Sequence, residues 1–140
     1  QAVIFKWAGV IPGNIQEIDH QIKKTSHWII ADKNETRNQL AEEVKLKLDQ
    51  QFQDDIKISQ LAKSMGVAHS KLTREFIASY GISPLDYRTK KRIFQAMTEL
   101  AFQDKSVIET SFEVGFSDLS RFNKNFKAIS KTQPSLFKSK

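Results

Sequence analysis

The chain has 140 residues, of which 39% are hydrophobic and 27% are charged, and it contains no cysteine. This length fits one domain or two very small ones and excludes a large enzyme scaffold, while the lack of cysteine excludes a disulfide and a thiolate nucleophile. Residues 1–55 carry seven Lys and Arg against nine Asp and Glu, whereas residues 56–140 carry fifteen against seven. This basic excess favours a polyanionic partner, either nucleic acid or an anionic membrane surface, unless it serves only solubility.

The first 36 residues predict no function. The longest apolar run, Trp28 to Ala31, has four residues, against the roughly 20 that cross a bilayer, so we expect no membrane span. The chain begins with Gln and has no basic-then-apolar leader, so we expect it to be a piece of a longer chain. We therefore treat residues 1–36 as an N-terminal extension or the remnant of an upstream domain, and residues 37–140 as one domain.

An internal repeat organises this domain. Apolar and small residues from Ile58 to Gly66 coincide with those from Val107 to Gly115 at an offset of 49, and the segments that follow coincide at an offset of 50. Each copy has the pattern of a helix, a tight turn and a second helix. Two copies are too few for a solenoid, so the sequence predicts an all-α fold with two tandem helix-turn-helix units.

The elements of the first half follow from capping and apolar spacing. Thr36 and Gln39 resemble a capping box for a helix over about residues 37–52. The first helix of the first unit is expected to end at Gly66, which suits a left-handed residue. The second helix of this unit is expected to direct four side chains inward: Leu72, Phe76, Ile77 and Tyr80.

A longer linker helix joins the two units. Ser83 is the predicted N-cap, and Pro84 suits the first helical position. Helical spacing then continues to Phe102, and at 1.5 Å per residue such a helix spans roughly 28 Å. Successive major-groove faces of B-DNA lie about 34 Å apart, so a spacer of this reach can hold two recognition helices one DNA turn apart.

The second unit repeats the pattern with one extra residue in its turn. Ser106 and Glu109 predict a capping box, Gly115 ends the first helix, and Ser117 is expected to cap the second. Phenylalanines on helical stripes are expected in the core, and not as an exposed stacking platform for single-stranded nucleic acid. They are Phe76, Phe94, Phe112, Phe116, Phe122 and Phe126.

Over about residues 38–138 the sequence resembles the DNA-binding domain of the AraC/XylS family of bacterial transcription regulators. The resemblance implies seven helices, with the second helix of each unit in a major groove. It implies sequence-specific binding of double-stranded DNA in the cytoplasm, RNA polymerase as a further partner, and an effector or dimerisation domain upstream. Its carriers are Ile58-Ser-Gln-Leu-Ala, Leu72-Thr-Arg-Glu-Phe76, Tyr80-Gly-Ile-Ser-Pro84 and Val114-Gly-Phe-Ser-Asp-Leu-Ser-Arg-Phe-Asn-Lys-Asn-Phe-Lys127.

Some positions depart from the family's pattern. Thr110 and Ser111 stand where the family usually has Ile-Ala, so we expect their helix to be less well anchored. Lys131 replaces the usual Gly before the last proline, and Ala68 replaces the usual capping Ser before the first recognition helix. The loss of a side-chain cap costs about 1 kcal/mol, which frays a helix without preventing the fold.

Carried over by position, the resemblance places seven side chains near base edges. Arg74 is the main candidate, because Arg can donate two parallel hydrogen bonds to guanine. Leu119 is expected either to contact a thymine methyl group or to pack at the start of its helix. Each residue alone also fits an ordinary solvated face. The base-proximal set is Ser70, Thr73, Arg74, Leu119, Ser120, Arg121 and Lys124.

Further basic side chains are candidates for phosphate contacts, which hold register and read no sequence. Arg92, inside the linker helix, is expected to fix that helix and not to contact DNA. The candidates for backbone contacts are Lys71, Arg88, Lys90, Lys127 and Lys131.

The sequence predicts no catalysis, metal or cofactor. Its three histidines, His20, His27 and His69, lack the spacing of a zinc site, and no phosphate-loop, nucleophile-elbow or dinucleotide-binding motif occurs. A competing interpretation is a helical protein–protein interaction module, which a steep salt dependence of duplex binding would exclude. An enzyme with a DNA-targeting domain would need its chemistry in an upstream segment.

Overall fold

The computed structural model describes residues 39–138. The predicted extension and the capping pattern that begins at Thr36 lie outside these residues or at their edge, and none of the described helices is long and apolar enough to span a membrane. The regular structure of the described part is entirely helical, as predicted. Its seven helices are α2 (Gln39–Gln51), α3 (Ile58–Ser64), α4 (His69–Tyr80), α5 (Pro84–Phe102), α6 (Val107–Glu113), α7 (Leu119–Ser130) and α8 (Pro134–Phe137).

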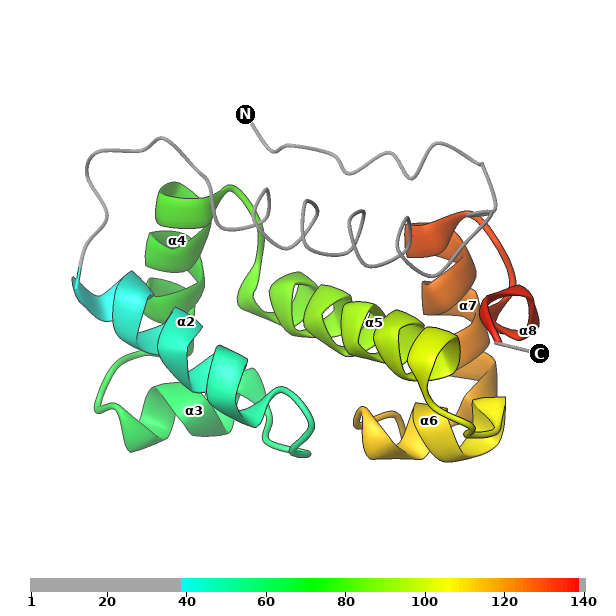
Figure 1. The fold of residues 1–140 in the computed structure, drawn as a ribbon. Helices are drawn as coiled ribbons and strands as arrows, with labels where there is room; N and C mark the ends of the chain where they lie inside the picture. The colour runs from blue at the N-terminus through cyan, green and yellow to red at the C-terminus, as the bar shows by residue number, and fades with distance from the viewer. Residues whose placement is uncertain (1–38, 139–140) are drawn as a thin grey trace.

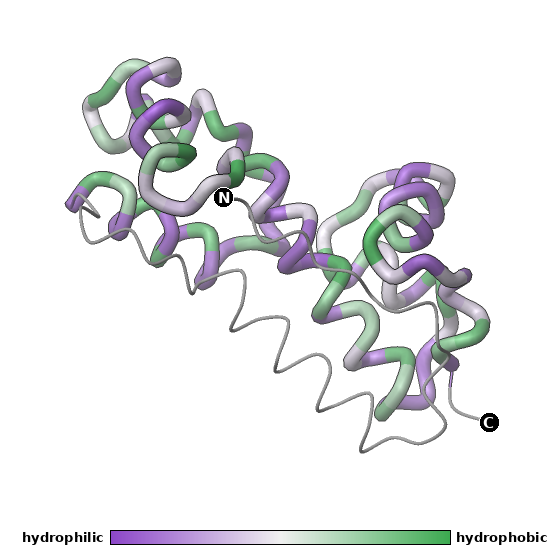
Figure 2. Tube along the Cα trace, turned by 90° about the horizontal axis from the view of Figure 1, so that it is seen from above, coloured by the Kyte–Doolittle hydropathy of each residue, from purple (hydrophilic) through white to green (hydrophobic). Residues whose placement is uncertain are grey.

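The helices form two units at the two ends of α5 (Figure 1). One unit contains α2, α3 and α4, and the other contains α6, α7 and α8. Each unit has its own hydrophobic core, and α5 contributes to both: Tyr87 belongs to the first core, and the buried residues from Ile93 onward belong to the second. Figure 2 shows hydrophobic and hydrophilic residues alternating along the helices, as amphipathic packing requires.

Local capping sets the starts of α5, α6 and α7. The Ser83 hydroxyl accepts a hydrogen bond from the backbone N–H of Asp86 at 3.1 Å, and Ser106 and Glu109 form the predicted capping box. The predicted cap Ser117 is wrong, because Asp118 occupies the N-cap of α7. Its carboxylate accepts from the backbone N–H of Ser120 at 2.7 Å, and a carboxylate favours the positive end of the helix dipole.

Two of the departures from the family pattern lie at helix ends, at the C-cap of α7 and at the N-cap of α4. Lys131 has φ 63°, so it adopts the left-handed conformation that a glycine would take without strain. Ala68 occupies the N-cap of α4 and provides no side-chain hydrogen bond. Both departures from the family pattern therefore keep the backbone geometry, with a strained left-handed residue at Lys131 and a missing side-chain cap at Ala68.

Two predicted core residues are exposed. Ile77 of α4 is 44% exposed and Phe112 of α6 is 54% exposed, so their assignment to the core was wrong. Each follows a buried residue directly in sequence, and one step along a helix turns a side chain by about 100° away from the buried stripe. The other phenylalanines predicted for the core are buried: Phe76, Phe94, Phe116, Phe122 and Phe126.

The polar pair in α6 faces the core. Thr110 and Ser111 are both fully buried, and the Ser111 hydroxyl donates to the carbonyl of Ile108 at 2.7 Å. The Thr110 hydroxyl is buried and has no hydrogen-bond partner. Since a buried unpaired hydroxyl costs free energy, this helix loses some of the stability that an Ile-Ala pair would provide.

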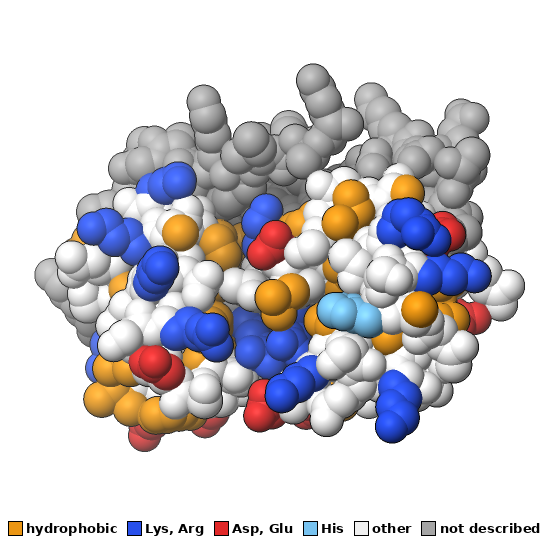
Figure 3. All heavy atoms as spheres, turned by 180° about the vertical axis from the view of Figure 1, so that it is seen from behind, with side chains coloured by type: hydrophobic (Ala, Val, Ile, Leu, Met, Phe, Trp, Pro, Cys, Tyr) orange, Lys and Arg blue, Asp and Glu red, His pale blue; other side chains and the backbone are white. Residues whose placement is uncertain are grey.

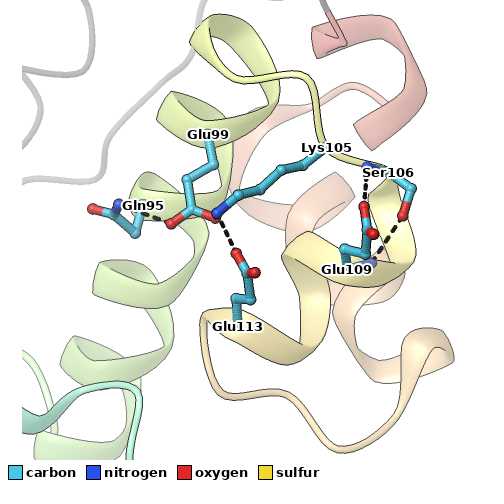
Figure 4. Close-up of polar contacts among 6 residues, drawn as sticks. All are labelled: Gln95, Glu99, Lys105, Ser106, Glu109 and Glu113. Carbon is cyan, nitrogen blue, oxygen red and sulfur yellow. Dashed lines mark hydrogen bonds and ion pairs between the residues drawn. The ribbon is translucent and has the colours of Figure 1, made fainter.

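A charged cluster connects α6 to α5 (Figure 4). The Lys105 ammonium group lies 3.5 Å from the Glu99 carboxylate and also pairs with Glu113. Gln95 donates to the same Glu99 carboxylate at 3.0 Å. Glu99 is buried, so this cluster adds a specific connection between the two helices.

Candidate nucleic-acid interface

The two predicted recognition helices, α4 and α7, border the same part of α5. Leu85 and Arg88 of α5 line one hollow together with His69 and Thr73 of α4. They line a second hollow together with residues of α7, among them Arg121. The N-terminal halves of α4 and α7 therefore lie on one face of the domain. Figure 3 shows the molecule from behind relative to Figure 1, with basic side chains over both units.

Buried aromatic and aliphatic residues fix the rotation of α4. Leu72 and Phe76 are fully buried, which turns the opposite side of the helix to solvent. Arg74 is exposed on that side, and Thr73 is half-buried at its edge. The remaining predicted residues of α4, Ser70 and Lys71, are exposed. The helix therefore presents the side chains that the sequence assigned to DNA as one surface.

The exposed face of α7 is more strongly basic. Phe122 and Phe126 are fully buried on the inner side, and the twelve residues of the helix include no Asp or Glu. Leu119 is half-buried and packs against the second core, so it has the packing role that was one of its two expected roles. The exposed predicted residues are Ser120, Arg121, Lys124 and Lys127.

The candidates for contacts with the DNA backbone differ in their exposure and in their hydrogen bonds within the protein. Lys71, Lys127 and Lys131 are exposed, whereas Lys90 is half-buried. The Arg88 guanidinium donates a hydrogen bond to the backbone carbonyl of Ile56, and its Nε is buried with no partner. Burial also lowers the pKa of Arg88 from its ordinary value. Arg88 therefore braces the loop before α3 against α5 while lining both hollows.

The sequence analysis did not select Asn123, a further exposed side chain of the candidate interface. Asn123 is exposed on α7 and lines a hollow with Lys124 and Lys127. It follows Ser120 by three residues and precedes Lys127 by four, a spacing that puts side chains on one helix face. Asn can form paired hydrogen bonds with adenine. The same spacing rule that selected Ser120 and Lys124 would have found it.

The described residues include no group of three His, Asp or Glu that could hold a metal ion. His69, the one histidine among them, is exposed at the start of α4. The exposed side chains of α4 and α7 supply hydrogen-bond donors and positive charge, which suit phosphate and base edges.

A family model described as a helix-turn-helix domain matches residues 61–140, which is more than half of the chain. The chain belongs to the AraC/XylS family of DNA-binding domains. Sequence-specific DNA binding is the function of this AraC-type domain.

The regulator to which the chain is similar is much longer than the region that the two share. An uncharacterized HTH-type transcriptional regulator of Staphylococcus aureus is 25% identical over 120 residues, which cover 85% of this chain and 16% of that protein. The chain thus spans about a sixth of the length of this curated relative.

Solved structures share the fold. The C-terminal domain of AraT, a response regulator from Geobacillus stearothermophilus, gives a TM-score of 0.70 at 20% identity, covering 73% of this chain and 85% of that chain. A probable AraC family regulator from Rhodopseudomonas palustris gives 0.63 at 21% identity, covering 70% and 93%. The DNA-binding domain of AdpA, solved in complex with a target DNA, gives 0.62 at 24% identity, covering 70% and 87%.

Proposed function

We propose that the domain binds double-stranded DNA through two successive major grooves, with α4 in one groove and α7 in the next. The observation that carries this proposal is that polar residues of α4 and of α7 line two hollows that share the same residues of α5, Leu85 and Arg88. The linker α5 has 19 residues, a length of about 28 Å at 1.5 Å per residue. A rigid body of this size suits two contacts about one DNA turn apart.

The side chains divide into those that read bases and those that hold phosphates. Arg74 is exposed and central on α4, so it is the proposed guanine-reading residue of the first groove. Arg121 and Lys124 are its counterparts on α7, with Asn123 as an additional base-reading candidate. Smaller polar contacts come from Ser70, Thr73 and Ser120, and phosphate contacts from Lys71, Lys90, Lys127 and Lys131.

The regulator of which this domain is a part is proposed to act in the bacterial cytoplasm, where it would meet RNA polymerase at a promoter. An effector or dimerisation domain in the same protein would control it. The 16% coverage of the Staphylococcus aureus relative supports further domains, because that regulator has most of its length outside the matched region.

A binding-site selection from random duplexes, followed by footprinting, tests the proposal. We expect a selected sequence protected over about 20 base pairs, with both major grooves contacted on one side of the duplex. The affinity should fall steeply with added salt, because several phosphates release their counterions. Protection of a single groove would show that α7 or α4 does not dock, and binding without salt dependence would favour a protein-interaction module.

A further inference from the structure

The two units of the domain are joined by few structural elements. Every extensive helix-to-helix contact in the described residues lies within one unit or involves α5. The two cores meet within α5, between Tyr87 of the first core and Ile93 of the second. A single helix between two cores would leave their relative orientation weakly determined, so other contacts at this boundary matter.

Arg92 lies at this boundary and contacts both units. Its guanidinium donates to the carbonyls of Phe52 and Asp54, the latter at 2.9 Å, in the loop after α2. The same guanidinium lies over the ring of Phe116, 5.7 Å from the ring centre, in the turn between α6 and α7. Arg92 is only 9% exposed. One buried side chain therefore donates hydrogen bonds to the first unit and places its charge over an aromatic ring of the second.

The two units also approach each other directly at Gly115. This residue has φ 109°, and a Cβ added to it would lie 2.7 Å from the backbone carbonyl oxygen of Gln53 and 2.8 Å from Nε of Arg92. The corresponding glycine of the first unit, Gly66, also has a positive φ of 69°, but a Cβ there would meet nothing within 4 Å. Of these two glycines, Gly115 alone is required by contact between the units as well as by its backbone conformation.

We propose that Arg92 and Gly115 form an interunit lock that fixes the orientation of α4 relative to α7 and so determines which spacing of the two DNA half-sites the domain accepts. The lock itself follows from the contacts above, whereas its effect on DNA rests on the proposed function. In this proposal both residues are positioning residues that act through the recognition helices.

The chemistry of Arg92 suits a permanent connection. Burial lowers the pKa of Arg92 to about 10, and the positive charge of Arg88 contributes to this shift. The guanidinium therefore stays protonated at neutral pH and keeps its donors. A lysine at this position would keep the charge but would lose the planar fork that bonds two carbonyls.

A distance measurement without DNA tests the lock. The chain has no cysteine, so Lys47→Cys on α2 and Ala128→Cys on α7, both exposed positions, provide unique spin-label sites for pulsed dipolar spectroscopy. We expect a narrow distance distribution in the otherwise unchanged chain. Arg92→Lys and Gly115→Ala should broaden or shift it, and Gly66→Ala is the matched control because it adds the same methyl group at a positive φ without an interunit contact.

Folding is monitored for each variant by circular dichroism, so that loss of structure is not mistaken for loss of orientation. Equal distributions for Gly115→Ala and Gly66→Ala, with both variants folded, would overturn the lock. If Arg92→Lys is unstable, the comparison of the two glycine variants still decides the question.

A binding experiment then tests the effect on DNA. The selected duplex is compared with duplexes in which one base pair is inserted or deleted between the two half-sites, which rotates one half-site by about 35°. The unchanged domain should lose affinity by about tenfold or more on the altered duplexes, equivalent to at least 1.4 kcal/mol. Arg92→Lys and Gly115→Ala should reduce this loss to about threefold, whereas Gly66→Ala should retain it.

The outcomes separate the two proposals. Failure of the unchanged domain to bind any duplex would contradict the proposed function, while the distance distributions would still report on the lock. Full spacing discrimination in both Arg92→Lys and Gly115→Ala would overturn the role of the lock in half-site selection.

Discussion

The hydroxyl of Tyr87 donates a hydrogen bond to Oδ1 of Asp49, which joins the start of α5 to the last turn of α2. Lys45 and Lys91 also contact this carboxylate, at 2.9 Å and 3.3 Å. Tyr87 is 1% exposed and lies edge-on to the ring of Phe76 of α4. A polar contact and an aromatic contact of the same side chain thus connect the first recognition unit to the linker helix.

Asp49→Asn should destabilise the domain in a pH-dependent way. Burial raises the pKa of Asp49, but the hydrogen bonds from Tyr87 and Lys45 and the charge of Lys91 outweigh it and hold the pKa below its ordinary value. The carboxylate therefore contributes stability above about pH 4, and this contribution is lost as the pH falls through the folded-state pKa. Urea unfolding should show a deficit for Asp49→Asn at pH 7 that shrinks toward pH 3.

Glu42→Gln is the control for this experiment, since Glu42 is exposed on the same helix. Its effect on the free energy of unfolding should stay within about 0.5 kcal/mol at pH 7. A deficit for Asp49→Asn that is constant between pH 3 and pH 7 would contradict the assigned role of the carboxylate charge.

Ala68→Ser should stabilise the first recognition helix. Ala68 already has the extended backbone of an N-cap, with φ −68° and ψ 141°, but lacks a side-chain acceptor. A serine hydroxyl there can accept a hydrogen bond from a backbone N–H of the first turn. This bond should raise the free energy of unfolding by about 1 kcal/mol. Asp118→Ala, which removes the existing cap of α7, should lower it by a similar amount in urea denaturation. An unchanged midpoint for Ala68→Ser would show that another group already satisfies these N–H groups.

The sequence predicted those parts of the fold that depend on neighbouring residues. Ser83 and Pro84 at the start of α5 and the capping box of Ser106 with Glu109 are local signals, and the linker helix has its predicted bounds of 84 and 102. Ser117 and Asp118 were harder to separate, because both are good caps and only the backbone geometry selects between them. The width of a buried stripe is also not local, which is why Ile77 and Phe112 were misassigned.

For the candidate site, the sequence could predict which face of each recognition helix is exposed. The exposed positions of Arg74 and Lys124 follow from the apolar spacing on the opposite side of each helix. The partners of Arg92 could not be predicted, because Phe52 and Asp54 lie about 40 residues away in the sequence. Gly115 was predicted as a helix end, and its close approach to Gln53 depends on how the two units meet.

Phe112→Ala should cost little stability, in contrast to Phe122→Ala. Phe112 is 54% exposed, whereas Phe122 is fully buried and packs edge-on against Phe116. Truncation of a buried phenylalanine costs about 3–5 kcal/mol, while an exposed position away from special features changes stability by about 0.5 kcal/mol or less. Urea unfolding of the two variants provides the comparison. A large loss for Phe112→Ala would place its ring in a contact within the folded chain.

Arg74→Ala should relax sequence discrimination while leaving the fold intact. Arg74 is exposed and Leu72 and Phe76 hold the other side of α4 in the core, so truncation removes no buried contact. A lost bidentate contact to guanine should cost about 1–3 kcal/mol of discrimination at one or two base pairs. The measurement is the affinity for the selected duplex and for a random duplex at two salt concentrations.

Lys127→Ala provides the contrast to Arg74→Ala. If Lys127 contacts only phosphate, its removal should weaken binding to both duplexes alike and lower the slope of log K against log salt by about one unit. Lys124 lies three residues before Lys127 on the same exposed face. We expect Lys124→Ala to behave like Arg74→Ala, because Lys124 is nearer than Lys127 to the start of α7, where α7 and α5 line the second hollow together. Equal losses on both duplexes for Arg74→Ala would make Arg74 a backbone contact and leave base reading in the first groove to Ser70 and Thr73.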